Sequence, residues 1–342
     1  MQNLPSPAEE QPPYDRVKAY LEDFKLHCEG RRTAVARDFD QLFRCRISPG
    51  DWLKVQRDLH IYDLDESPGR FSYETRCKFS YHASTSTLII ECAAPSAMHE
   101  VAVGFIEGCF RSVTDPTTVG FVRNEDYELK GEGPDPTKKA DLALDEFTHG
   151  GHKYRWVLEV GFSETYDELL EDIQTWLTRS GGDIVHGVLM KITEEPPYRC
   201  PLPGVSDEEL ERRGLKSHDD ISEDDFVMEG EYGPVSYQGD RWVGEIKEVF
   251  WEVWRLDPET RQLRLVAQRE VIVPKTSSSS QIQLDEFLTT APANVQASLD
   301  WDLFRLLLKR KIPSLGLKRY QTWIRTRKRR DGDDRRTDPD YV

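Results

Sequence analysis

The clearest hydrophobic pattern in the chain lies between residues 138 and 178. Two segments rich in β-forming residues flank a turn with Gly150 and Gly151, which supply the positive-φ positions that a hairpin needs. Ser163 and Thr165 then precede apolar residues at helical spacing: Leu169, Leu170, Ile173, Trp176 and Leu177. The pattern therefore predicts a strand, a turn, a second strand over 154–162 and an amphipathic helix that Gly181 and Gly182 end.

Similar reasoning divides the rest of the N-terminal half. Helical spacing is present from Tyr14, over 34–45 and from Trp52 to Leu59, and it predicts a helical cap. Alternating apolar residues predict strands at 70–81, 87–92 and 119–123, with a helix at 98–113.

In the C-terminal half, residues 184–193 form an apolar run typical of a buried strand. A Pro-rich and acidic stretch over 196–240 has the composition of a long solvated insertion, mobile or partly disordered. Two alternating segments, 242–256 and 262–273, predict a hairpin that extends the sheet. Residues 276–280 have the composition of a flexible link, and helices are expected at about 281–288, 303–311 and 317–330.

These elements predict a mixed α/β (α+β) protein with six parts. They are a disordered tail (1–13), a helical cap (14–69), a core (70–195), the acidic insertion (196–241), a C-terminal hairpin with helices (242–330) and a second disordered tail (331–342).

Composition narrows the classes of function. The 342 residues carry a formal net charge of −16, which is unusual for a dedicated DNA-binding surface, although a local cleft can still be basic. Six cysteines without a CxxC pair or zinc spacing indicate an intracellular, reducing compartment, either cytoplasmic or nuclear. No apolar run approaches transmembrane length, so we expect no membrane partner. The oligomeric state is not readable from the sequence.

Glu159 lies within the apolar run Trp156-Val157-Leu158-Glu159-Val160, and this is the main chemical anomaly. An unpaired buried carboxylate is costly, so Glu159 should face a cleft, a cation or a metal. With Asp141 on the adjacent strand it would make a two-carboxylate oxygen site suited to Mg²⁺ or Mn²⁺. Alternatively, Glu159 lies on an edge strand and faces water.

The same residues resemble the restriction-endonuclease-like PD-(D/E)XK nuclease superfamily, in its branch of uncharacterised restriction-endonuclease-type proteins. Residues 87–100 are similar to the opening strand, small-residue loop and "HE" helix start of that branch. Ala140-Asp141 stands at the "PD" element and Glu159-Val160-Gly161 at the (D/E)XK element. The resemblance spans roughly residues 70–195. It implies a four-stranded mixed sheet flanked by helices in the order α-β-β-β-α-β, and metal-dependent cleavage of DNA phosphodiesters.

The lysine that the family places two residues after the acidic residue is Gly161 here. Lys138, Lys139, Lys153 and Lys191 are candidate substitutes, and Lys191 on the following strand is the one assigned a catalytic role with Asp141 and Glu159. Glu100 near the start of the first helix is a third candidate metal ligand, or simply an acidic residue that complements the helix dipole. Neighbouring His99 either positions phosphate or water, or lies at the edge of the core. The missing lysine also favours the alternative of a non-catalytic binding or scaffold protein that keeps the nuclease fold.

The only concentrated positive charge lies near the C-terminus. Arg325, Arg327, Lys328 and Arg329 follow Tyr320 and Trp323. Such a stretch is typical of a phosphate-backbone contact or a nuclear-import signal, and also of a solvated tail or a segment that docks on the acidic insertion. Nucleic acid is therefore a possible partner.

Overall fold

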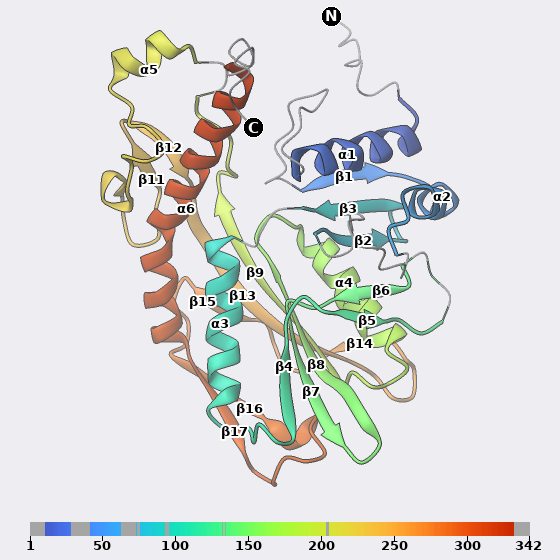
Figure 1. The fold of residues 1–342 in the computed structure, drawn as a ribbon. Coiled ribbons are helices and arrows are strands. Elements are labelled where there is room, and N and C mark those ends of the chain that lie inside the picture. Colours follow the sequence, from blue (N-terminus) through green and yellow to red (C-terminus); the bar gives the residue numbers. More distant parts are fainter. Residues whose placement is uncertain are drawn as a thin grey trace, which may run out of the picture. The chain divides into compact units, whose positions relative to one another are not determined.

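The computed structural model describes residues 11–28, 42–62, 73, 76–92, 96–131, 133, 135–202 and 205–331. The chain divides into two compact units. Residues 1–94 and 125–139 form the N-terminal unit, and residues 95–124 and 140–342 form the sheet unit. Mixed α/β architecture is confirmed, with helices and several sheets (Figure 1).

The N-terminal unit contains two helices, a three-stranded antiparallel sheet of order β1-β3-β2 and a small hairpin of β5 and β6. The elements are α1 (Pro13–Cys28), β1 (Phe43–Arg46), α2 (Pro49–Leu59), β2 (Lys78–His82), β3 (Thr87–Glu91), β5 (Asp126–Glu128) and β6 (Thr137–Lys139). Helix α2 begins where Ser48 caps it and Pro49 presets the first turn. Trp52, Val55 and Leu88 are among the buried residues of the core of this unit.

Two sequence predictions for this region need correction. The helix expected over 34–45 is wrong at its C-terminal end, because Phe43–Arg46 pairs with β3 as a strand and buries Cys45. The rest of that expected helix, residues 34–41, lies outside the described residues. The strands expected at 70–81 and 87–92 exist in part, as β2 and β3, but they pair in this separate sheet and not in the main sheet of the core.

The sheet unit is built on a seven-stranded sheet of order β14-β13-β9-β8-β7-β4, with β15 also paired to β13. Strands β8 and β9 are parallel and the other pairs are antiparallel. The elements are α3 (Ala97–Arg111), β4 (Val119–Val122), β7 (Leu142–Thr148), β8 (Gly151–Gly161), α4 (Tyr166–Arg179), β9 (His186–Glu195), β13 (Glu245–Leu256), β14 (Leu263–Leu265) and β15 (Glu270–Val273). The predicted hairpin at 242–273 is confirmed as an extension of the sheet.

Helices α3 and α4 cover opposite faces of this sheet (Figure 1). Leu158 and Val160 of β8 belong to the core cluster that contains Phe105 of α3. A β-carbon at Gly161 would instead meet Leu169 of α4. Because successive strand residues point to opposite faces, Glu159 shares the α4 face with Gly161.

The C-terminal region differs from its prediction. It contains α5 (Asp207–Arg213), a 3₁₀ turn (Glu223–Asp225), β10 (Val227–Met228), β11 (Val235–Tyr237), β12 (Asp240–Val243), β16 (Ser279–Gln283), a 3₁₀ turn (Leu284–Glu286), β17 (Gln296–Asp300) and α6 (Trp301–Asp331). The acidic insertion is not simply solvated, because Phe226, Val235 and Tyr237 are buried in the core cluster with Tyr320 of α6.

Two further predictions in this region are wrong. Residues 281–288 begin in strand β16 and not in a helix, because Ser279–Gln283 pairs with β17, and the flexible link expected at 276–280 runs into that strand. The two C-terminal helices are one continuous helix, α6, with Pro313 inside it. The predicted disordered tails lie largely outside the described residues, which begin at residue 11 and end at residue 331.

Candidate carboxylate site

Asp141 lies immediately before β7 and is almost fully buried, with 4% of its surface exposed. Its Oδ2 accepts a 2.7 Å hydrogen bond from the backbone N–H of Val160 on β8. The same oxygen lies 2.9 Å from Nε2 of His99, in the first turn of α3. The side chain of Asp141 therefore ties the end of β8 to helix α3.

Glu100 and Arg123 continue this polar chain along α3. Oε1 of Glu100 lies 3.6 Å from Nδ1 of His99, and its Oε2 lies 3.4 Å from Arg123. The close contact with the His99 imidazole, followed by the charges of His99 and Arg123, holds the pKa of Glu100 below its usual value against the effect of burial and of Asp141. Arg123 also pairs with Glu107. The structure thus brings two predicted residues, Asp141 and Glu100, to one imidazole.

Glu159 has a different partner. The indole N–H of Trp176 on α4 donates a 2.6 Å hydrogen bond to Oε1 of Glu159, which is 1% exposed. A capping box, in which Thr165 and Glu168 exchange hydrogen bonds, stabilises the N-terminus of α4. Glu159 is therefore buried between the sheet and α4, and the edge-strand alternative, in which it faces water, is wrong.

The two central carboxylates thus bond to helices on opposite faces of the sheet. Asp141 binds His99 of α3, and Glu159 binds Trp176 of α4. Within the described part of the chain, no three side chains of His, Cys, Asp or Glu gather to hold a metal ion. One oxygen of Asp141 accepts the N–H of Val160 and one oxygen of Glu159 accepts the indole N–H of Trp176, so a cation held by Asp141, Glu159 and Glu100 stays a prediction.

Lys191 lies directly beside the position where the family has its lysine. In the parallel register of β8 and β9, Gly161 pairs with Lys191. The Nζ of Lys191 donates hydrogen bonds to the carbonyl oxygens of Phe162 (3.2 Å) and Ile192 (3.0 Å). Paired residues on neighbouring strands point to the same face, so Lys191 lies on the α4 face with Glu159. At Gly161 itself, a β-carbon would overlap the side chain of Leu169.

Strand β13 carries a further buried carboxylate, Glu252, which the sequence analysis does not single out. Glu252 is 4% exposed and accepts hydrogen bonds from Tyr166 (3.1 Å), Trp254 (3.0 Å) and Arg269 (2.7 Å). Burial and the charge of Glu252 raise the pKa of the Tyr166 phenol. The available signal was the one used for Glu159, namely a lone acid inside an apolar alternating strand. Asp172 of α4, which is 2% exposed, was missed as a site candidate as well.

The basic C-terminal stretch forms the end of α6. Arg325 is exposed, and its Nε donates a 3.4 Å hydrogen bond to the carbonyl of Gln321 in the same helix. The side chains of Arg327, Lys328 and Arg329 lie outside the described residues. Their expected contact with a phosphate backbone stays a prediction.

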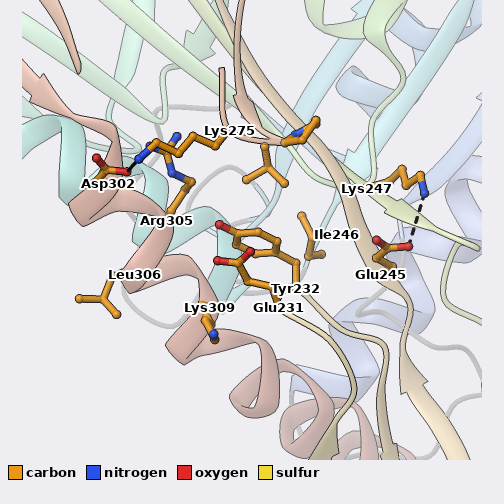
Figure 2. A pocket seen from close by; sticks show the side chains of 12 residues that line it. Glu231, Tyr232, Glu245, Ile246, Lys247, Lys275, Asp302, Arg305, Leu306 and Lys309 are labelled. Atoms are coloured by element: carbon orange, nitrogen blue, oxygen red, sulfur yellow. Dashed lines mark hydrogen bonds and ion pairs between the residues drawn. The ribbon is translucent and has the colours of Figure 1, made fainter. Parts of the chain in front are cut away.

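A cavity of about 650 Å³ lies elsewhere in the sheet unit, between α6, the start of β13 and the end of β15 (Figure 2). Asp302 pairs with both Lys275 and Arg305 along one wall, and Lys247 lies near Glu245 on another. Burial and the neighbouring Glu231 raise the pKa of Tyr232, which lines the cavity between these walls. None of the predicted site residues lines this cavity. Its lining comes from segments that are far apart in the sequence, so no local pattern indicates it.

No helix among the described residues combines the length and the apolar composition needed to cross a membrane. No known family model, no curated protein and no solved structure matches this chain.

Proposed function

We propose that this chain is a non-catalytic binding or scaffold protein that keeps a restriction-endonuclease-like fold. Within the sheet unit, which excludes β5 and β6, the order α3, β4, β7, β8, α4, β9 supports the fold, because it follows the α-β-β-β-α-β order that the resemblance implies. The strand order β9-β8-β7-β4, with only β8 and β9 parallel, is a mixed sheet as expected. Helices on both faces complete the arrangement.

The observation that carries the proposal is the packing of α4 on Gly161 and Glu159. Leu169 fills the space that a lysine side chain at position 161 would need. Trp176 engages the carboxylate of Glu159 and buries it. A nuclease needs a cation near the developing charge of the transition state, and Leu169 leaves no room for a lysine side chain that starts at position 161 itself.

The partners of Asp141 support the same conclusion. Its carboxylate accepts the N–H of Val160 and contacts His99, so it stabilises the junction of β8 with α3. Hydrogen bonds to a buried carboxylate contribute to stability, and removal of the donors leaves an expensive unsatisfied charge. Both acidic residues therefore have a structural role that accounts for their burial without hydrolysis. The net charge of −16 also favours a partner other than a polyanion.

Calorimetric titration with Mn²⁺, together with a plasmid-nicking assay in Mg²⁺ and in Mn²⁺, tests this proposal. We expect no saturable metal binding at micromolar concentrations and no cleavage. Asp141→Asn and Glu159→Gln would then behave as the parent in both assays, and the exposed Asp219→Asn is the matched control. Cleavage that both core variants abolish and the control retains would overturn the proposal.

A metal-dependent nuclease acting on DNA is the second candidate, and the register of Lys191 favours it. The neighbouring strand delivers an ammonium group next to Gly161, on the same face as Glu159. Under this candidate, Lys191→Met loses cleavage, whereas Lys311→Met, on the exposed surface of α6, retains it. Absence of DNA cleavage by the parent protein would contradict the nuclease candidate.

A further inference from the structure

Two thiols of the N-terminal unit face each other at the open end of the β2–β3 hairpin. Cys77 precedes β2 and Cys92 follows β3, and the strand register pairs the adjacent residues Lys78 and Glu91. Extension of that register by one residue places Cys77 opposite Cys92. Their sulfur atoms lie 3.0 Å apart, as free thiols. Nothing in the proposed function involves either residue.

We infer that Cys77 and Cys92 form an oxidation site that closes to a cross-strand disulfide in the presence of a peroxide. Residues directly opposite on antiparallel strands have Cα atoms about 4.5–5.5 Å apart. A disulfide spans Cα separations of about 4.4–6.8 Å, so the bond forms without movement of the backbone. The sulfur atoms already point toward each other, which removes the need for a large side-chain rearrangement.

The environments of the two thiols determine which cysteine reacts with the peroxide first. Cys77 is 4% exposed, and burial together with its contact with Cys92 raises the pKa of its thiol. Cys92 is only partly buried and therefore meets the oxidant first. Its thiolate attacks one peroxide oxygen, the O–O bond breaks, and Cys92 becomes a sulfenic acid while hydroxide leaves and takes up the proton that the thiol released.

Cys77 then completes the reaction. Its sulfur loses a proton and attacks the sulfur of Cys92, so that the S–S bond forms, the S–O bond breaks and the second hydroxide leaves as water. In total, two thiols lose two hydrogen atoms and one peroxide is reduced to two water molecules. Cys77 is thus the resolving thiol, held at the distance that this second step needs.

The bond would crosslink the central strand of the three-stranded sheet to its neighbour. Strand β3 pairs with both β1 and β2, and the closed loop would contain both hairpin strands and the turn between them. A crosslink restricts the unfolded chain more than the folded one, so oxidation stabilises the N-terminal unit. The pair therefore makes the stability of this unit depend on the redox state.

Peptide mapping of the full chain tests the inference. The protein is reduced, desalted, treated with a small excess of hydrogen peroxide, alkylated and cleaved after glutamate. Cleavage then places Cys77 in residues 75–91, Cys92 in 92–100, Cys109 in 108–125 and Cys28 in 23–29, so that every pairing gives a distinct product. We expect peptides 75–91 and 92–100 to be linked in most chains, with a mass loss of two hydrogen atoms, and to separate on reduction with dithiothreitol.

Variants and thermal unfolding complete the test. In Cys77→Ser, Cys92 should be trapped as a sulfenic acid that dimedone labels, whereas Cys109→Ser should retain the link. Peroxide should raise the unfolding midpoint of the parent by several degrees and leave that of Cys92→Ser unchanged. A link between Cys28 and Cys77, or oxidation of Cys92 without any link in the parent, would overturn the inference. The parent peptide map decides the question even where a variant fails to fold.

Discussion

The indole of Trp176 and the carboxylate of Glu159 are joined by a 2.6 Å hydrogen bond between helix α4 and the sheet. This contact accounts for the acidic residue in an otherwise apolar strand, because a buried carboxylate needs a donor. It also means that α4 cannot lift from the sheet without exposing or orphaning that charge. The same residue that indicates a metal site in the sequence is a packing contact in the structure.

Trp176→Phe tests this role directly. The variant keeps the aromatic volume and removes the N–H donor, so we expect a loss of about 2–3 kcal/mol in the free energy of unfolding. Urea denaturation measures the loss, and Glu159→Gln combined with Trp176→Phe completes a double-mutant cycle. A stability equal to that of the parent would show that Glu159 obtains its stabilisation elsewhere.

Gly161→Ala should destabilise the protein because its β-carbon overlaps Leu169. Overpacking of this kind costs about 1–3 kcal/mol. Gly108 in α3 is the matched control, since a β-carbon there meets nothing within 4 Å. We expect Gly108→Ala to be neutral or stabilising, as alanine is the better helix former. Equal effects of the two substitutions in chemical denaturation would contradict the packing argument.

His186 predicts a pH dependence of stability. Burial, followed by the nearby charge of Arg255, lowers the pKa of His186 to about 4, whereas the unfolded chain has the ordinary value of 6.5. Between pH 4 and 6.5 the imidazole is protonated in the unfolded chain and neutral in the folded protein. The free energy of unfolding is therefore unaffected by this group above pH 6.5 and decreases as the pH falls toward 4.

The size of that loss is about 3 kcal/mol at most. His186→Phe keeps the ring that packs near Phe287 and removes the titration. Denaturation of both proteins at a series of pH values from 4 to 7 should show a shallower slope for the variant. Parallel slopes would mean that His186 does not titrate between pH 4 and 6.5.

Asp135 should be essential for the N-terminal unit. Its carboxylate accepts hydrogen bonds from the indole of Trp52 (2.8 Å) and from the backbone N–H of Tyr81 (2.9 Å). Asp135→Ala leaves both donors buried without this partner, at a cost of about 2–5 kcal/mol. Hydrogen exchange at the Tyr81 amide should accelerate, while Asp135→Asn, which keeps one acceptor oxygen, should have a smaller effect. Unchanged exchange in Asp135→Ala would contradict the assignment.

Local patterns in the sequence predict many of the elements of the sheet unit. The hairpin at Gly150, the capped helix α4 and the extension by β13 follow from spacing and turn chemistry. The partners of β2 and β3 do not follow, because alternation specifies which face is buried and not which sheet the strand joins. The same limit explains the wrong helix at 281–288, where pairing with β17 decides the structure.

The candidate site was predictable in its residues but not in their contacts. An acidic residue within an apolar run indicates that Glu159 has a partner. The sequence alone does not distinguish a metal ion from the indole N–H of Trp176 as that partner. Lys191 was correctly placed on the strand after α4, and its pairing with Gly161 required the parallel register. Glu252 is also an acidic residue among apolar residues of a strand, and the same reasoning would have predicted a partner for it, which is Arg269 in the structure.

The return of the chain to the N-terminal unit at residues 125–139 limits how the protein can be dissected. A single truncation before Pro95 would delete the partners of Asp135 and leave the β5–β6 hairpin attached to the remaining fragment without its sheet. A recombinant fragment of the sheet unit therefore requires two cuts and a short connection from Asn124 to Ala140, whose backbone N–H and carbonyl already lie within 2.9 Å of each other.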